Sequence, residues 1–496
     1  MEENTCVANT GKSLKKNAAL NMAKSIMAII FPLITFPYAS RILGPVYIGK
    51  VNFAQSIVSY FSLIAALGIS TYAVREAAKL REDKTQLSVF IKEIFTLNLI
   101  STFVAYVLFT IALFIVPQFA EYKKLLVICG ASILFTTLGM DYLYTALEDF
   151  KYITIRSIAF QFLSLILLFI FVRNQDDYYK YAAISVISSV GSNLLNFFHA
   201  RKFVTFKMNT KLCIKKHLKP VFTMFAMSAA VSIYTVLDTT MLGLIKGDEA
   251  VGLYTAATKI NRMVLMMITA ATTVLLPRLS YYAGKENNVE FSRLSQKAMN
   301  FVIMFSIPAA AGLFILAEPI ILLFSGKQYI SATSAMQIMN AIIILIGMSN
   351  LIGIQIFMSV GKEKITLYSV LTGALVNFCM NFILIPHFGV NGAAIGTVCA
   401  EFCVTLIQLI TARSYFNGKN LILHTVKVII SALLMSLCVF AVCKFTESFG
   451  LKIVLGIVTG ILIYSLCLFL LRDSLFIELF KQIMGKFKKK DRKTNA

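Results

Sequence analysis

The sequence predicts an all-α polytopic membrane protein with about fourteen transmembrane helices. Of the 496 residues, 58% are hydrophobic and only 14% are charged, whereas soluble domains contain about 45–50% apolar and about 25% charged residues. The apolar residues form runs of about 20, long enough to cross a hydrocarbon core of about 30 Å. Because these runs are continuous, helices rather than barrel strands satisfy the backbone hydrogen bonds in lipid.

The predicted spans follow one another along the chain, each an apolar run with charged or turn-forming residues at its ends. The first group lies at 17–39, 48–70, 90–116, 125–147, 153–172 and 180–199. The second group follows a basic segment and lies at 220–243, 252–276, 298–324, 334–359, 366–386 and 392–412. Two more spans lie at 426–443 and 452–471. The N-terminal segment is polar and no small-residue cleavage site follows the first run, so the first helix is not predicted to be a removable signal peptide.

The two groups of spans contain an internal duplication. The segment "IGKVNFAQSI" (48–57) aligns with "VGLYTAATKI" (251–260) at an offset of 203 residues, and the same offset pairs Gly44 with Gly247. Because the register holds across a whole predicted helix, the match indicates a repeated structural unit.

A second match has nearly the same offset. The segment "YTALEDFKYITIRS" (144–157) aligns with "IFMSVGKEKITLYS" (356–369), and Arg75 pairs with Arg278 at the first offset. The constant order predicts two pseudo-symmetric six-helix lobes of the same orientation, which would enclose a midplane cavity. Repetition of the two arginines predicts an architectural role for both, as helix caps or headgroup anchors.

The spans and the duplication together define the predicted domain organisation. It comprises a cytoplasmic tail 1–16, an N-lobe 17–200, a basic cytoplasmic linker 201–219, a C-lobe 220–416, the two C-terminal helices 417–472, and a basic cytoplasmic tail 473–496.

Lysine and arginine gather on one side of this arrangement. If both termini are cytoplasmic, that side carries roughly three times as many of these residues as the other, so the positive-inside rule predicts cytoplasmic termini. The net charge of +23 is then explained by basic segments beside anionic lipid. We therefore expect membrane lipids, and no nucleic acid, as partners of the basic segments.

The sequence indicates neither a metal site nor an active site. Most of the nine cysteines lie within apolar spans, and none has the spacing of a metal knuckle. We find no phosphate-binding loop, dinucleotide fingerprint or nucleophile elbow, and the four histidines are scattered. The non-cytoplasmic connections are too short to build the acceptor site of a glycan polymerase. We therefore expect no enzymatic activity, no metal and no cofactor.

Three motifs carry a resemblance to a known family. They are the early "RILGPVYIGKVNFAQSIVSYFSLIAALGISTYAVREAAK", the "LEDFKYI" after the fourth span, and the later "IKGDEAVGLYTAATKI" with its "LLPRLS". Over roughly residues 15–470 the chain resembles the polysaccharide-biosynthesis family of Wzx-type O-antigen flippases, in the MATE-like multidrug/oligosaccharidyl-lipid/polysaccharide exporter superfamily.

The resemblance implies a function and a compartment. It implies that an undecaprenyl-pyrophosphate-linked oligosaccharide, such as an O-antigen or capsule repeat unit, is moved by alternating access across a bacterial inner membrane. It also implies polysaccharide polymerase or assembly proteins as further partners.

Two cations inside the span 252–276 are the main site candidates. Lys259 and Arg262 are three residues apart and so share a helix face. A cation at the centre of a membrane helix costs about 2.5–3.5 kcal/mol on insertion scales, so it normally faces a cavity or a partner. The duplicated positions are Ser56 and Ser59. Only one lobe therefore carries the charge, as a site for an anionic diphosphate requires.

Other cations leave alternatives open. Asp238 lies at a depth that matches Lys259, so these two could form an ordinary interhelical ion pair instead of a substrate site. Lys24 either contacts the diphosphate or extends toward the membrane surface, and Arg41 is either a further substrate contact or an interfacial residue.

Acidic residues at membrane depth support a rival function. Asp141, Glu318 and Glu401 are the groups that a MATE-like multidrug or cation antiporter would need to bind H⁺ or Na⁺. Because these carboxylates are dispersed and the clustered charge is positive, the sequence favours the flippase. A non-transporting scaffold for glycan assembly has no sequence feature of its own.

Overall fold

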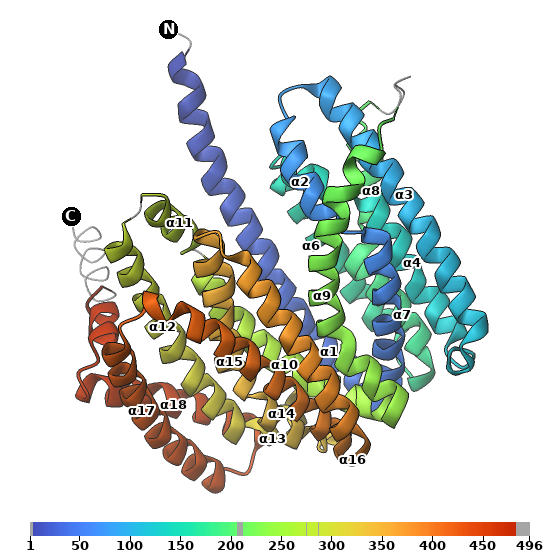
Figure 1. Ribbon diagram of the computed structural model, residues 1–496. Helices are drawn as coiled ribbons and strands as arrows, with labels where there is room; N and C mark the ends of the chain where they lie inside the picture. Colours follow the sequence, from blue (N-terminus) through green and yellow to red (C-terminus); the bar gives the residue numbers. More distant parts are fainter. Residues whose placement is uncertain (1–2, 206–211, 274, 286, 483–496) are drawn as a thin grey trace, which may run out of the picture. The chain divides into compact units, whose positions relative to one another are not determined.

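The computed structural model describes residues 3–205, 212–273, 275–285 and 287–482. All regular secondary structure in these ranges is helical, which confirms the predicted all-α class (Figure 1). The chain divides into two compact units, Met1–Gly252 and Leu253–Ala496.

Unit 1 is built around its first helix. The long α1 packs against α3, α4, α6 and α9. The helices of this unit are α1 (Glu3–Ala66), α2 (Ile69–Lys79), α3 (Lys84–Ile115), α4 (Lys123–Gly139), α5 (Asp141–Ala146), α6 (Phe150–Phe171), α7 (Tyr178–Val186), α8 (Asn193–Ala200) and α9 (Lys215–Lys246). The compact units thus divide after α9, whereas the predicted lobes divide at 201–219. Since the lobes are defined by the sequence repeat and not by contacts, their boundaries stay a prediction.

Unit 2 contains most of α10 and all later helices. The long α12 packs against α15 and α17, and α17 packs against α18. The helices are α10 (Asp248–Thr273), α11 (Leu276–Gly284), α12 (Asn288–Ile315), α13 (Ala317–Phe324), α14 (Ala332–Met339), α15 (Ala341–Asn350), α16 (Glu363–Ala412), α17 (Gly418–Phe445) and α18 (Phe449–Leu470).

Two of the longest helices are each divided by a glycine. The backbone of α1 breaks at Gly44 (φ 73°) and that of α16 at Gly389 (φ 54°), a conformation that residues with a Cβ rarely adopt. Within the described residues, 11 helices are long and apolar enough to cross a membrane. Once these two are divided at their glycines and α10 is added, the helices match the predicted spans one to one, which is consistent with the predicted count.

One predicted span differs clearly from the structure. The apolar run 298–324 was expected to form one helix, but α12 begins ten residues earlier, at Asn288, and ends at Ile315. The first turns of α12 are polar, so hydropathy alone does not detect them. The last part of the predicted span forms the separate α13.

The duplication is visible in local structure. Gly44 has φ 73° and ψ 175°, and its sequence partner Gly247 has φ 81° and ψ −171°. Arg75 and Arg278 lie on the short helices α2 and α11, which follow the second helix of each predicted lobe. The two sequence pairs therefore occupy equivalent structural positions.

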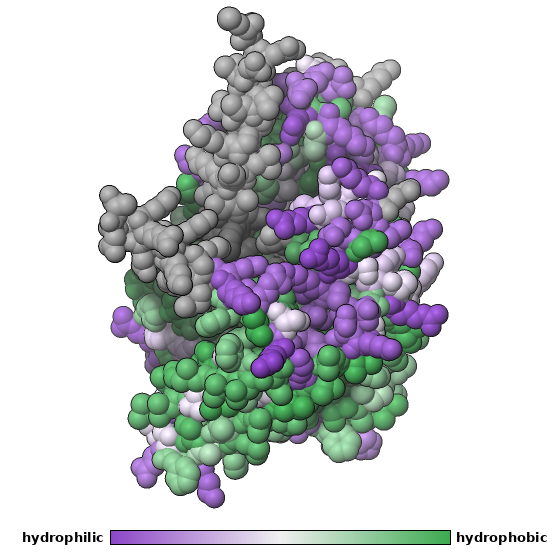
Figure 2. Space-filling view, turned by 90° about the vertical axis from the view of Figure 1, so that its left-hand side faces the viewer, coloured by the Kyte–Doolittle hydropathy of each residue, from purple (hydrophilic) through white to green (hydrophobic). Residues whose placement is uncertain are grey.

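Apolar side chains cover much of the surface. On the face that Figure 2 draws, hydrophobic residues form a continuous area in the lower half, and hydrophilic residues gather above it. Such a surface suits hydrocarbon on one part and water or headgroups on the other.

Candidate functional site

A cavity lined by hydroxyl groups lies within unit 1. Its volume is about 420 Å³. Most of its lining residues carry a hydroxyl group, and they come from α1, α2, α4 and α9: Ser59, Ser62, Ser70, Thr71, Thr136, Ser228, Ser232 and Thr235. None of the described lining residues is ionisable. Because a hydroxyl both donates and accepts hydrogen bonds, this cavity can match the hydroxyls of a sugar.

The break between α1 and α2 shapes one wall of this cavity. Leu67 (φ 45°) and Gly68 (φ 67°) are left-handed, so the chain turns and a new helix starts. A Cβ at Gly68 would collide with the backbone of Phe225 on α9, which explains the glycine. The first turn of α2 brings Ser70 and Thr71 to the cavity, where the backbone N–H groups of a helix start are also free to donate.

The predicted cations lie on one face of α10. Lys259 is half-buried and Arg262 is exposed. The opposite face packs within unit 2, where Asn261 is buried and its Nδ2 donates to the carbonyl of Met336 (3.3 Å). Arg262 thus lies on an exposed part of α10, whereas its neighbour Asn261 is buried against α14.

The other predicted cations, Lys24 and Arg41, and the predicted ion pair do not extend this site within the described residues. The side chain of Lys24 lies outside the described residues, and Arg41 is exposed near the Gly44 break of α1. Asp238 is buried on α9 of unit 1, whereas Lys259 belongs to unit 2. Their pairing stays a prediction.

Asp141 has a partner that the sequence did not suggest. Its carboxylate accepts hydrogen bonds from Arg156 (3.3 Å) and from Asn196 (2.9 Å), and Arg156 is buried, with a second bond to the carbonyl of Ser192 (3.2 Å). We missed Arg156 because it lies near one end of the predicted span 153–172. The available signal was a lone cation inside that apolar run.

The other two candidate acids lie apart. Glu318 is exposed in the first turn of α13, and Glu401 is buried in the second half of α16. The structure therefore does not bring Asp141, Glu318 and Glu401 together within one site in either unit.

An apolar groove of about 370 Å³ lies in unit 2 between α12, α13, α17 and α18. Its lining includes Pro308, Leu316, Met435 and Gly460. The small side chains on α18 leave room beside the large ones on α12 and α17. A groove of this composition suits a hydrocarbon chain.

A buried histidine attaches α17 to its neighbours. Nδ1 of His424 lies 2.7 Å from the carboxylate of Asp473, and Nε2 lies 2.9 Å from the carbonyl of Asn300 on α12. A backbone carbonyl can only accept, so Nε2 carries the hydrogen of the bond to Asn300. Burial acts to raise the pKa of Asp473, but the hydrogen bonds from His424 and from the backbone N–H of Phe476 hold it below its ordinary value.

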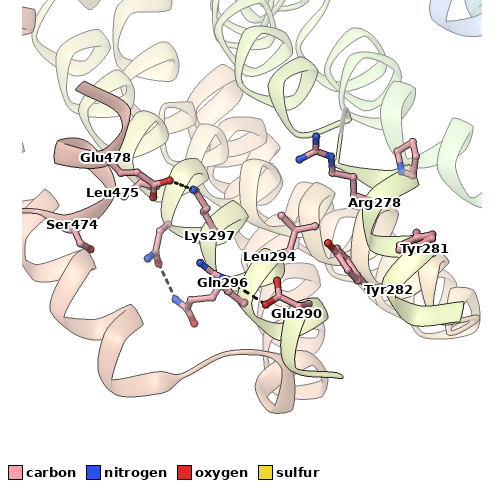
Figure 3. A pocket seen from close by; sticks show the side chains of 13 residues that line it. Arg278, Tyr281, Tyr282, Glu290, Leu294, Gln296, Lys297, Ser474, Leu475 and Glu478 are labelled. Atoms are coloured by element: carbon pink, nitrogen blue, oxygen red, sulfur yellow. Dashed lines mark hydrogen bonds and ion pairs between the residues drawn. The ribbon is translucent and has the colours of Figure 1, made fainter. Parts of the chain in front are cut away.

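A larger polar cleft of about 580 Å³ lies between α11, α12 and the segment after α18. Figure 3 shows Arg278 on α11 extending toward α12, and Lys297 paired with Glu478. Glu290 likewise accepts from Arg293 on the same helix (3.3 Å). Since its charges are largely paired with one another, this cleft is a weaker ligand site than the hydroxyl-lined cavity.

Comparisons with known proteins give a consistent result. The family model described as polysaccharide biosynthesis protein matches residues 14–283, and the MatE model matches residues 223–383. A protein of Escherichia coli (strain K12), named as a candidate O-antigen transporter, is 25% identical over 422 residues, which cover 84% of this chain and 100% of that protein.

Solved structures share the fold. A lipid II flippase MurJ in an inward closed conformation has a TM-score of 0.74 at 18% identity, over 94% of this chain and 99% of that chain. An inward-facing MATE multidrug transporter has a TM-score of 0.54 at 15% identity, over 80% and 94%. The predicted MATE-like fold is thereby confirmed.

Proposed function

Because the chain belongs to the polysaccharide biosynthesis protein family, we propose that it is a flippase for a lipid-linked oligosaccharide. The substrate would be an undecaprenyl-pyrophosphate-linked repeat unit of an O-antigen, capsule or related polysaccharide. The hydroxyl-lined cavity of unit 1 is the observation that carries this proposal. The name of the E. coli relative supports the same substrate class.

The cavity suits the glycan part of this substrate. Sugars present many hydroxyls in several directions, and serine and threonine can donate to some and accept from others. The uncharged wall binds sugar hydroxyls through neutral hydrogen bonds, which are weaker than hydrogen bonds to charged side chains. Release on the other side of the membrane needs that weaker binding, since a carrier must bind substrate and also let it leave.

The other two parts of the substrate have candidate partners in unit 2. The diphosphate is anionic, and Arg262 can bind phosphate oxygens with two parallel N–H donors. The polyprenyl chain is apolar, and the groove between α12, α17 and α18 offers an apolar lining. Each chemical part of the substrate thus has a matching surface in this chain.

The proposal includes a compartment and partners. The protein would lie in a bacterial inner membrane with both termini cytoplasmic, as the distribution of lysine and arginine predicts. Membrane lipids and polysaccharide polymerase or assembly proteins would be its neighbours. An H⁺ or Na⁺ ion could couple transport, and no metal or organic cofactor is proposed.

A MATE-like cation antiporter is the second candidate, and the MatE match over residues 223–383 favours it. A cation exporter needs carboxylates where its substrate binds. The described lining of the unit 1 cavity has none, so this candidate is the weaker one.

Reconstitution separates the two functions. We expect the purified protein in proteoliposomes to exchange a fluorescent undecaprenyl-diphosphate oligosaccharide between leaflets, measured by chemical quenching from outside. Ser232→Phe should fill the cavity and abolish exchange, whereas Ser189→Phe, at an exposed position outside the cavity, should not. Efflux of organic cations driven by a H⁺ or Na⁺ gradient, without lipid exchange, would instead establish the antiporter.

A further inference from the structure

A second pocket of unit 1 is separate from the hydroxyl-lined cavity. It has a volume of about 420 Å³ and lies between the first turns of α6 and the helix α8. Its lining includes Asp149, Lys151, Ile155, Arg156 and Leu195. The two cavities share no lining residue.

One side of this pocket opens on a lipid-facing surface. Ile155 is 56% exposed and Leu195 is 47% exposed. Beyond Lys151, every exposed residue of α6 is apolar, including Phe162 and Ile166. An exposed helix face without a polar residue over several turns is suited to hydrocarbon and not to water. The pocket is therefore accessible to molecules in the bilayer.

The other side of the pocket is cationic. Arg156 is only 6% exposed, and its Nε has no hydrogen-bond partner among the described residues. The side chain of its acidic partner Asp141 is 54% exposed to solvent and also accepts a hydrogen bond from Asn196. The Asp141 carboxylate compensates the positive charge of Arg156 only in part, because it is solvated and also accepts a hydrogen bond from Asn196. The buried guanidinium can therefore bind a further anion.

Two further groups complete the polar end. Lys151 is exposed at the second residue of α6. The pocket also contains one acid, Asp149, whose carboxylate caps α6 by accepting a hydrogen bond from the backbone N–H of Tyr152 (3.3 Å). A negative group beside Lys151 would also benefit from the positive end of the α6 dipole.

We propose that this pocket binds an anionic phospholipid of the surrounding bilayer. The phosphate lies between Lys151 and Arg156, and the upper part of an acyl chain lies against Ile155 and Leu195. Charge complementarity favours an anionic over a zwitterionic lipid. The apolar walls favour a lipid over free phosphate, which would leave them without a partner. Transport of any glycan is not required for this binding.

The test uses the purified full-length protein in detergent, titrated with phosphatidylglycerol or phosphatidylcholine and followed by native mass spectrometry. We expect phosphatidylglycerol to bind more tightly. Lys151→Gln should weaken its binding about fivefold, as expected for one cation lost beside an anionic lipid. Lys419→Gln is the matched control, because Lys419 is also exposed at the second residue of a helix, α17. It should leave the affinity unchanged.

Further variants and competitors identify the source of the phosphate and show whether a variant is still folded. Arg156→Lys keeps the charge but loses the planar fork, so it should weaken binding while the thermal transition in detergent stays cooperative. Equal affinity for both phospholipids, or equal effects of Lys151→Gln and Lys419→Gln, would overturn the proposal. So would full competition by glycerol phosphate, or preferred binding of undecaprenyl diphosphate at Lys151.

Discussion

Arg262 lies on the exposed side of α10, so its removal should leave the packing of unit 2 intact. If it binds the diphosphate, Arg262→Ala should lower surface glycan in a complementation assay by at least about tenfold, at unchanged protein level. Arg262→Lys should keep part of the surface glycan, because an ammonium keeps the positive charge but cannot make two parallel hydrogen bonds to the phosphate. Arg413→Ala, at an exposed arginine after α16, is the control. Full complementation by Arg262→Ala would show that the diphosphate binds elsewhere.

Asp141 is a poor candidate for a coupling carboxylate, because it already accepts hydrogen bonds from Arg156 and Asn196. We expect Asp141→Asn to lower thermal stability in detergent, since the buried Arg156 loses its ion pair. The ion dependence of transport should not change. Loss of H⁺ or Na⁺ dependence with unchanged stability would reverse this assignment and return Asp141 to the coupling role.

The candidate site could be predicted from sequence only where a residue was unusual for its surroundings. Lys259 and Arg262 were found because charge is rare inside an apolar run. The hydroxyl-lined cavity was missed, since single serines and threonines are common in membrane helices. Moreover, its residues come from four helices and lie up to 176 positions apart, from Ser59 on α1 to Thr235 on α9. Only the folded chain brings them together.

At the level of helices, the sequence predicted which segments cross the membrane more reliably than how they are joined. Long apolar runs are dictated by the thickness of the bilayer, so their positions follow from composition. The joints at Gly44 and Gly389 depend on one backbone conformation each. Polar extensions such as the start of α12 have no hydropathy signal and were therefore placed outside the span.

The attachment of α17 to α12 should depend on the buried pair His424 and Asp473. His424→Leu or Asp473→Leu leaves the other group buried without its partner, which typically costs about 3–5 kcal/mol. Replacing both with leucine should cost less than either single change. The measurement is thermal unfolding in detergent. Glu290→Gln, which breaks an exposed pair with Arg293, should have a much smaller effect. Additive single and double effects would contradict direct coupling.

Across the whole molecule, the duplicated architecture has become chemically asymmetric. Unit 1 contains the uncharged hydroxyl-lined cavity, and unit 2 contains the cations of α10 together with the apolar groove. At the duplicated position of Arg262, unit 1 has Ser59, which lines its cavity. The substrate that we propose is itself composed of sugar, diphosphate and hydrocarbon, so it matches this chemical difference between the units. A symmetric substrate would not.

The orientation of the whole chain gives the last prediction. Helix α9 has 32 residues and is therefore about 48 Å long at 1.5 Å per residue, which exceeds the hydrocarbon core. Its two ends must lie on opposite sides of the membrane. Reporter fusions after Lys202 and after Asp473 should both report cytoplasm, and a fusion after Gly247 should report the other side, because lysine and arginine favour the cytoplasm. If all three reports were inverted, the fold would stand and the orientation would be wrong. A report of the same side at Lys202 and Gly247 would contradict the assignment of α9 as a membrane span.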